Sequence, residues 1–230
     1  MTEFTTWRSL VDGEEIIAIP DTWIDNFNND DDPEQAGLYN GQTLSDFYSG
    51  DVSGFGRSFG DGLIGDHALE VTTDFSGMFS QPQDGLNQYP EEGDKIPVYL
   101  KDPMEADVAF MFNLDDSSTP VGYGVRLNDN RFHIMKGEYD SNSGAGDTQE
   151  SSGQVIDPMS DWHLFEIDPP TSENDELAIT AFTVDQEDGE RIEQLEIISI
   201  NDSDFVGNRA IGYNIYGDGS GVGWEFPHII

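Results

Sequence analysis

The apolar residues of this chain occur almost only in short runs, which are rich in β-branched and aromatic side chains and bounded by Gly, Asn, Asp or Pro. No window of 12 residues shows the 3.6-residue apolar repeat of an amphipathic helix. Short bounded runs are typical of β-strands. We therefore expect an all-β chain, with strands near 4–10, 14–19, 44–48, 55–59, 68–73, 76–80, 94–101, 106–114, 121–127, 131–136, 162–168, 176–184, 191–200, 210–216 and 222–229.

Two of these runs indicate how the strands stack. Residues 108–112 are apolar at every position, which is typical of a central strand covered on both faces. Residues 131–136 alternate instead, with Phe132 and Ile134 on the face opposite to His133. A strand with two apolar faces needs a layer over each of them. We therefore expect two antiparallel sheets packed as a sandwich.

A polar, turn-rich segment at 25–43 separates a short N-terminal piece from the rest of the chain. The 24 residues before it are too few to bury a core of their own. We therefore predict an attachment segment at 1–43 and one sandwich domain at 44–230. Residues 138–154 have low complexity and are rich in Gly, Ser and acidic residues, which predicts a mobile loop.

The charge of the chain excludes several classes of partner. It has 9 Lys and Arg against 47 Asp and Glu, for a formal net charge of −38. A binder of nucleic acid or of an anionic membrane needs a basic face, so we expect neither partner. Scarce Lys and abundant Asp are typical of a protein kept soluble in concentrated salt, where the Debye length falls to roughly 3 Å at 1 M. We therefore expect a halophilic source.

Residue types that serve metal binding and nucleophilic catalysis are present, but their spacing is not specific. The four histidines are scattered, the chain has no cysteine, and no serine lies on a strand-to-helix elbow. Acidic strings at 29–32, 128–130 and 217–221 hold the oxygen ligands that Ca²⁺ prefers, although none has the spacing of an EF-hand. With 47 acids in the chain, such strings also arise as solvated loops, so both interpretations stay open.

One stretch departs from the acidic background. Residues 121–136 carry three of the nine bases, Arg126, Arg131 and Lys136, against the single acid Asp129. The Asn-Asp-Asn sequence within this stretch tolerates positive φ, and it predicts a hairpin between two strands.

This basic stretch has two interpretations. In the first, hydrogen-bond donors and a stacking ring bind a sugar or an anionic glycan, with the site residues Tyr123, Arg126, Asn130, Arg131 and His133. In the second, the bases only pair with acids on neighbouring strands. The sequence leaves both open.

Six segments, taken in chain order, resemble a known family: LSDFYSGDVSGF at 44–55, ALEVT at 68–72, YGVRL at 123–127, FHI at 132–134, WHLFEID at 162–168 and GVGWEF at 221–226. They resemble the laminin-G-like jelly-roll domain of the concanavalin A-like lectin/glucanase superfamily, of the kind found in haloarchaea and haloarchaeal tailed viruses. The resemblance covers nearly all of 44–230 and none of 1–43. It implies a jelly-roll with one concave, ligand-facing sheet and a structural Ca²⁺ near the first and last strands, for which we expect the ligands Asp46, Asp218 and Glu225.

The same superfamily includes β-glucanases that carry a Glu-x-Asp-x-x-Glu or Glu-x-Asp-x-Glu strand. Here Glu166 and Asp168 are followed by Pro169 and Pro170, and the second glutamate is missing. Hydrolysis needs an acid and a second carboxylate at a fixed separation, and two prolines end a strand. The resemblance therefore implies binding without catalysis.

We expect a non-enzymatic structural and adhesion protein. The first assignment is a surface, turret or tail component of a haloarchaeal virus, whose lectin-like domain contacts a host glycan or S-layer glycoprotein while the N-terminal segment binds other virion proteins. The alternatives are a cellular or secreted carbohydrate-binding module and, less favoured, a glycoside hydrolase. No signal peptide is recognisable in the first 20 residues, which favours the virion because its proteins assemble in the cytoplasm. We also expect a homo-oligomer.

Overall fold

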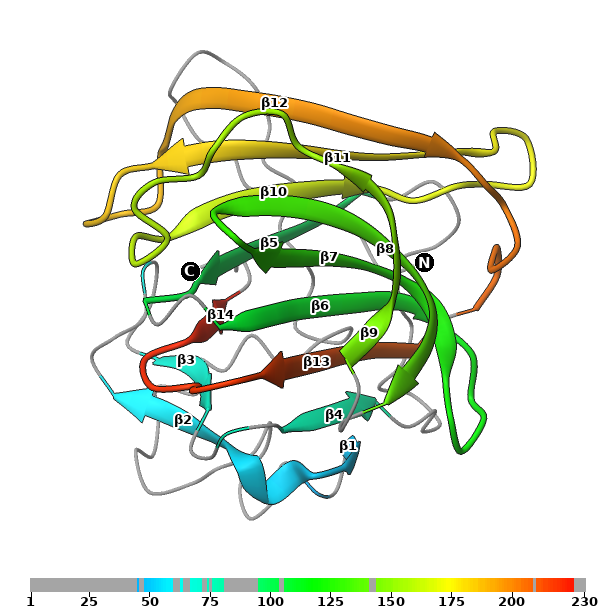
Figure 1. The fold of residues 1–230 in the computed structure, drawn as a ribbon, viewed down its shortest axis with the longest axis horizontal. Coiled ribbons are helices and arrows are strands. Elements are labelled where there is room, and N and C mark those ends of the chain that lie inside the picture. The colour runs from blue at the N-terminus through cyan, green and yellow to red at the C-terminus, as the bar shows by residue number, and fades with distance from the viewer. Residues whose placement is uncertain are drawn as a thin grey trace, which may run out of the picture.

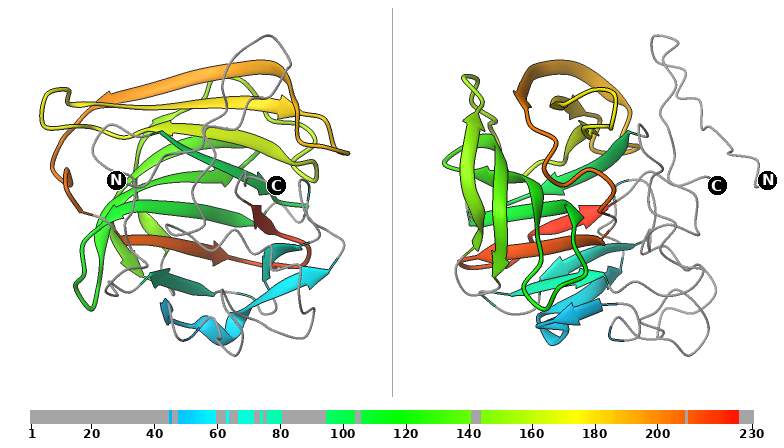
Figure 2. Two further views of the ribbon diagram at one scale, coloured as in Figure 1. Left: turned by 180° about the vertical axis from the view of Figure 1, so that it is seen from behind. Right: turned by 90° about the vertical axis from the view of Figure 1, so that its right-hand side faces the viewer.

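The computed structural model describes residues 45, 48–59, 63, 67–71, 74, 76–80, 95–103, 106–140, 144–208 and 210–225. This part of the chain forms two antiparallel sheets of seven strands each, stacked as a sandwich (Figures 1 and 2). The first sheet has the order β1-β4-β13-β6-β7-β8-β9, and the second sheet has the order β12-β11-β10-β5-β14-β3-β2. The predicted all-β sandwich is confirmed, and its architecture is compatible with a jelly-roll.

The first sheet consists of β1 (Tyr48–Gly50), β4 (Gly77–Ser80), β13 (Ala210–Tyr216), β6 (Asp107–Leu114), β7 (Val121–Asn128), β8 (Arg131–Asp140) and β9 (Gly144–Ser151). The second consists of β12 (Arg191–Asn201), β11 (Glu176–Val184), β10 (His163–Asp168), β5 (Ile96–Lys101), β14 (Gly223–Glu225), β3 (His67–Val71) and β2 (Phe55–Phe59). A short 3-10 turn, η2 (Val52–Gly54), precedes β2.

The predicted strands at 55–59, 176–184 and 210–216 match β2, β11 and β13 to the residue. The predicted strands at 4–10 and 14–19 and the attachment segment at 1–43 lie outside the described residues. The boundary between segment and domain therefore stays a prediction.

Aromatic side chains join the two sheets across the core. Phe132 on β8 packs edge to face against Phe165 on β10, with 5.5 Å between the ring centres. Tyr213 on β13 packs in the same way against Trp224 on β14, at 5.6 Å. All four side chains are fully buried. Because each pair has one member in each sheet, the sheets cannot separate without exposing these rings to water.

The central strand β6 is buried on both faces, as its apolar run predicts. Phe110 faces the second sheet, while Ala109 and Met111 lie on the outward face and are also buried. The first sheet curls so that β9 passes over this outward face, close to β13 and β6 (Figure 1). At the end of β8, the Tyr139 hydroxyl donates to the backbone carbonyl of Tyr213 at 2.6 Å, which fastens the curl.

The prediction of a mobile loop at 138–154 is wrong. β8 continues to Asp140, and β9 runs from Gly144 to Ser151. Small and polar residues suit this edge strand because one of its faces is exposed. Gly146, with a φ of 74°, lies so close to β8 that a Cβ atom would come within 2.5 Å of the Lys136 carbonyl oxygen. Gly146 therefore permits β9 to approach β8 closely at this point.

The hairpin prediction is confirmed. β7 and β8 pair Asn128 with Arg131, and the turn between them consists of Asp129 and Asn130, with φ values of 51° and 58°. Two consecutive residues with positive φ match the right-handed twist of the flanking strands.

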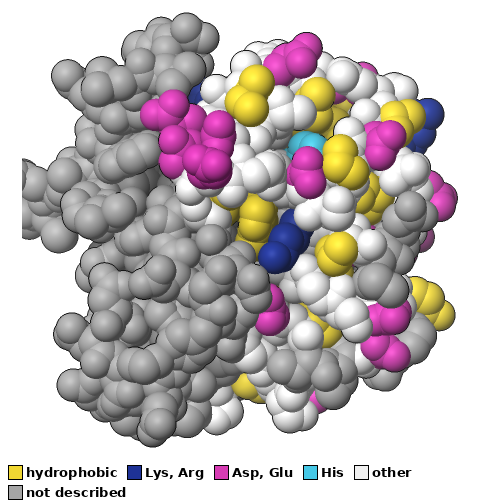
Figure 3. All heavy atoms as spheres, turned by 90° about the vertical axis from the view of Figure 1, so that its left-hand side faces the viewer, with side chains coloured by type: hydrophobic (Ala, Val, Ile, Leu, Met, Phe, Trp, Pro, Cys, Tyr) yellow, Lys and Arg dark blue, Asp and Glu magenta, His cyan; other side chains and the backbone are white. Residues whose placement is uncertain are grey.

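Acidic side chains are spread among hydrophobic and uncharged ones on the face shown in Figure 3, where Lys and Arg are few. No helix in the described part of the chain is long and apolar enough to span a membrane.

We expect the melting temperature to fall when salt is withdrawn. The chain has 47 acids against 9 bases, so most exposed carboxylates have only like charges near them. The Debye length grows from roughly 3 Å at 1 M salt to about 10 Å at 0.1 M, and repulsion between neighbouring carboxylates is then no longer screened. Calorimetry across this range of KCl concentration tests the expectation. A melting temperature that does not change with KCl contradicts it.

We also expect Gly122→Ala to destabilise the first sheet. Asn113 on β6 has a φ of 50°, and a Cβ atom at Gly122 would lie 2.8 Å from the backbone oxygens of both Asn113 and Phe112. Backbone atoms in a sheet cannot move aside, so the cost should be about 1–3 kcal/mol in denaturant unfolding. Gly153→Ala is the matched control, because a Cβ there meets only the Glu196 side chain at 3.4 Å. Equal stability of the two variants contradicts the prediction.

Candidate functional site

Two neighbouring rows of polar side chains lie on the outward face of the first sheet, which is turned away from the second sheet. Strand register places Asn214, Ala109, Arg126, His133 and Ser151 side by side on β13, β6, β7, β8 and β9. Side chains alternate along a strand, so this row points away from the core residues beside it.

The second row lies next to the first. Tyr216 on β13 pairs with Asp107 on β6, the Asn128 side chain hydrogen-bonds to Asp107, and Asn128 pairs with Arg131 on β8. We call the polar members of the two rows the polar face, which consists of Asp107, Arg126, Asn128, Arg131, His133, Ser151, Asn214 and Tyr216.

Arg126 is fixed near the middle of the polar face. Its Nε atom lies 3.2 Å from Asp107 Oδ1, and its Nη2 atom donates to Thr148 Oγ1 at 3.1 Å. Burial raises the pKa of Asp107 above its usual value, although the Arg126 guanidinium opposes this rise. Arg126 therefore ties β6, β7 and β9 together and retains about a fifth of its exposure, at 21%.

His133 is buried and uncharged at neutral pH. Its Nδ1 lies 2.8 Å from Ser151 Oγ, and its Nε2 lies 3.2 Å from the Asn128 carbonyl oxygen. A carbonyl oxygen only accepts, so Nε2 carries the proton and Nδ1 accepts from the serine hydroxyl. Burial lowers the pKa of His133 below 6.5. His133 therefore contributes no charge for a ligand.

Arg131 and Asn130 hold the chain that follows β9. Arg131 Nη1 donates to the carbonyl oxygens of Ser152 and, at 2.8 Å, of Gly153. The backbone carbonyl of Asn130 accepts from the amide of Ile156 at 2.8 Å. The structure thus places the predicted residues Arg126, Asn130, Arg131 and His133 together, and it also gives each of them a partner within the protein.

Tyr123 does not belong to this group. Its ring is fully buried in the core, because it shares a strand face with Val125 and Leu127 and lies opposite to Arg126. Tyr123 therefore cannot be the stacking surface that we expected. Two residues that the sequence analysis missed take its place on the polar face, Asn214 and Tyr216. The alternation in β13, where Tyr213 and Ile215 face the core, is the signal that would have identified them.

Asn214 and Tyr216 differ from the rest of the polar face. Tyr216 is 47% exposed, which makes it the most accessible aromatic side chain of this face. Asn214 is 2% exposed, and its Nδ2 atom has no hydrogen-bond partner. Its neighbours in register are Gly77 on β4 and Ala109 on β6, neither of which extends beyond Cβ. A buried amide without a partner costs stability, so a hydrogen-bond acceptor beside it would be favourable.

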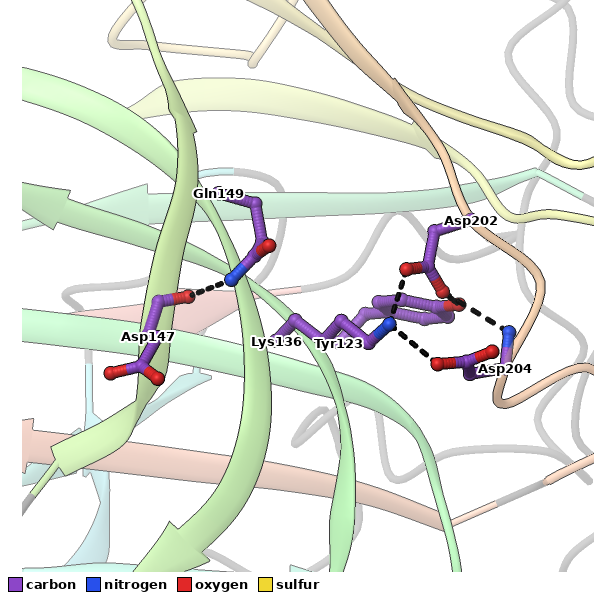
Figure 4. Close-up of polar contacts among 6 residues, drawn as sticks. All are labelled: Tyr123, Lys136, Asp147, Gln149, Asp202 and Asp204. Carbon is purple, nitrogen blue, oxygen red and sulfur yellow. Dashed lines mark hydrogen bonds and ion pairs between the residues drawn. The ribbon is translucent and has the colours of Figure 1, made fainter.

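The third base of the stretch, Lys136, lies on the core side of β8 and binds a loop (Figure 4). Its Nζ atom contacts Asp202 and, at 2.7 Å, Asp204, while the Tyr123 hydroxyl donates to Asp202. The Phe205 ring packs against Tyr123 with 4.9 Å between ring centres. These contacts fasten the segment between β12 and β13 onto the first sheet. In Figure 4, Asp147 and Gln149 on β9 contact each other and not this cluster.

The charges of this cluster stabilise each other. Hydrogen bonds to Asp202 and Asp204 raise the pKa of Lys136 above its usual value. Burial opposes ionisation of Asp202, but hydrogen bonds from Lys136 and Tyr123 outweigh it and hold the pKa of Asp202 below 3.8. Lys136 thus fits the interpretation in which a base pairs with acids of the protein.

The predicted calcium ligands are only partly described. Asp46 and the side chain of Glu225 lie outside the described residues. Asp218 is exposed, and its Oδ1 atom accepts from the Ser220 amide at 3.0 Å, which lowers the pKa of Asp218. Among the described side chains, no group of three or more His, Asp or Glu could hold a metal ion. Calcium binding therefore stays a prediction.

The two carboxylates considered for glycoside hydrolysis are held in ion pairs on the second sheet. Glu166 on β10 pairs with Arg191 on β12, and both side chains are largely buried. Asp168 lies 3.7 Å from Lys95, and both are about half exposed. Glu166 links two strands that do not pair directly, since β11 lies between them.

Comparison with known proteins adds no relative. No protein-family model matches the chain, and no curated protein matches it.

We expect Lys136→Met to destabilise the protein by about 2 kcal/mol at neutral pH, because it leaves Asp202 without its charged partner. Asp202 has a lowered pKa, so this difference should be present above pH 3.8 and lost as pH falls through the folded-state value. Urea unfolding of both proteins at several pH values measures it.

Lys95→Met is the control for this prediction. Its ion pair with Asp168 is 3.7 Å long and about half exposed, so its loss should cost less than about 0.5 kcal/mol. The structural role of Lys136 is contradicted if the two variants lose equal stability. It is also contradicted if the destabilisation by Lys136→Met grows as the pH falls.

Proposed function

We propose that this protein is a non-enzymatic adhesion module that binds a glycan on the polar face of its first sheet. One observation carries the proposal: an exposed aromatic ring, Tyr216, lies beside the acceptor Asp107, which in turn contacts the donor Arg126, on one sheet face. Sugars are bound by a stacking ring together with a few fixed hydrogen-bonding groups. The polar face provides both.

The charge of the polar face favours a neutral or an anionic sugar. Arg126 and Arg131 there balance Asp107 and the nearby Asp129 of the hairpin turn, and His133 is uncharged because burial lowers its pKa, so this face lacks the strong negative charge of the chain as a whole. Most other surfaces of a chain with a net charge of −38 repel a carboxylate or a sulfate. A uronic acid or a sulfated sugar of a host glycan or an S-layer glycoprotein fits this pattern.

The proposal includes a laminin-G-like lectin domain without hydrolytic activity. Glu166 is held in an ion pair with Arg191, so its carboxylate is not free to protonate a leaving group. Asp107 is the one carboxylate of the polar face as defined above, whereas glycoside hydrolysis needs a pair of them. The pattern favours binding over catalysis.

We further propose that the module is displayed on the surface of a haloarchaeal virus and is attached to other virion proteins through residues 1–43. The basis is the resemblance of 44–230 together with a preceding segment too short to bury its own core. A cellular carbohydrate-binding module is the alternative. Mass spectrometry of purified particles separates the two, since the chain is a stoichiometric component of a virion or is absent from it.

We expect Tyr216→Ala to weaken glycan binding about tenfold or more, because it removes the ring that would cover the sugar. Arg126→Ala should weaken binding by about 1–3 kcal/mol through the loss of a charged hydrogen bond. Both are measured by titration calorimetry in molar KCl, with glycans first identified on an array.

Arg191→Ala is the matched control for Arg126→Ala. Both arginines are largely buried in ion pairs, but Arg191 lies on the second sheet. Thermal unfolding of each variant separates lost stability from lost binding. If Tyr216→Ala and Arg126→Ala bind the glycan as the parent does, the polar face is not the site.

A further inference from the structure

The edge strand β12 carries exposed apolar side chains that the proposed glycan site does not use. In the described part of the chain four large hydrophobic side chains are exposed, and two of them lie on β12: Ile192 at 67% and Ile197 at 54%. A third, Val155 at 49%, follows Gln154, whose amide donates to Glu196 Oε2 on β12 at 2.7 Å. Two exposed isoleucines on one edge strand make that strand a candidate interaction surface.

The charged side chains of β12 all lie between Arg191 and Glu196. Arg191 pairs with Glu166, while Glu193 and Glu196 are the acids of the strand, and the stretch Ile197–Asn201 carries no charged side chain. About one residue in five of the whole chain is acidic, with 47 of 230. Two copies with a net charge of −38 repel each other, so they can meet only where the acids are sparse.

The backbone of β12 offers a template for pairing. β12 ends the second sheet, and among the described strands only β11 pairs with it. The register with β11 shifts twice between Arg191 and Ile197, whereas Ile197–Asn201 pairs regularly with β11. Bulges protect an edge against pairing, so the regular stretch is the part left available. Ile197 lies on the outward face there, because Ile198 beside it is in the core.

We propose that a second copy of this chain docks on β12, in antiparallel orientation and centred on the stretch Ile197–Asn201. The two second sheets then join into one continuous sheet across a two-fold axis. An antiparallel pair of identical strands uses the same edge of both copies, so the assembly closes at the dimer. The edge amides gain partners, and Ile197 is buried against the partner copy.

The oligomeric state of the full chain in molar KCl tests the proposal. Sedimentation equilibrium should give a dimer for the parent protein, and Ile197→Lys should weaken association about tenfold or more. This substitution lowers the net negative charge, so general electrostatics would favour association of the variant. Loss of the dimer therefore reports the apolar contact.

Tyr216→Lys is the matched control, because it makes the same change at an exposed hydrophobic residue of the first sheet. It should remain a dimer. Amide hydrogen exchange should show residues 197–201 more protected in the concentrated parent than in Ile197→Lys. If Ile197→Lys unfolds, as its melting temperature would reveal, Ile197→Thr replaces it.

Three results overturn the proposal: a monomeric parent at high concentration in molar KCl, a dimer that survives folded Ile197 variants, or a dimer without added protection at 197–201. The test is independent of the proposed glycan site. A monomeric protein would not contradict glycan binding at Tyr216. In the same way, a protein that binds no glycan would not contradict the dimer.

Discussion

The burial of the central strand β6 on both of its faces is the constraint on which the rest of the structure depends. Phe110 packs against the second sheet, and Met111 must be covered on the other side. The first sheet meets this demand by curling, so that β9 passes over β13 and β6 and Tyr139 bonds to the backbone of Tyr213. The curl also determines which polar side chains of the outward face are exposed to solvent. Asn214 is buried beneath it, whereas Tyr216, two residues further along β13, remains exposed.

The scarce bases of the chain occupy places where separate elements must be tied together. Arg126 joins β6, β7 and β9, Arg131 holds the segment after β9, and Lys136 fastens the segment between β12 and β13. These side chains are partly buried, so salt screens their contacts less than those of exposed charges. Three of these contacts use bases from the same short stretch, because its two strands lie next to the elements that are tied. A cluster of bases with structural partners therefore resembles a ligand site when only the sequence is known.

Short bounded apolar runs predicted the fold class and most strands, and the turn residues predicted the hairpin. The period-2 pattern adds which face of each strand is buried. Two predictions were wrong because they relied on residue composition and not on this alternation. Tyr123 has the same parity as Val125 and Leu127 and opposite parity to Arg126, so it could not share a face with Arg126. Residues 138–140 and 144–151 lie in strands because edge pairing tolerates glycine and polar residues. The contacts of Lys136 with Asp202 join positions 66 residues apart, and no local pattern encodes them.

The two proposed surfaces lie on different sheets, and this separation has a physical consequence. A two-fold axis at β12 joins the second sheets and leaves Tyr216 on the first sheet exposed in both copies. A dimer then presents two polar faces with a fixed mutual orientation. When two sites engage glycans on one surface, the second binding event is intramolecular, so overall affinity can exceed that of one site by about 10²–10⁴ without any new contact. Weak recognition by a ring and a few hydrogen bonds then suffices for attachment, and concentrated salt favours it further by screening the repulsion between the two copies.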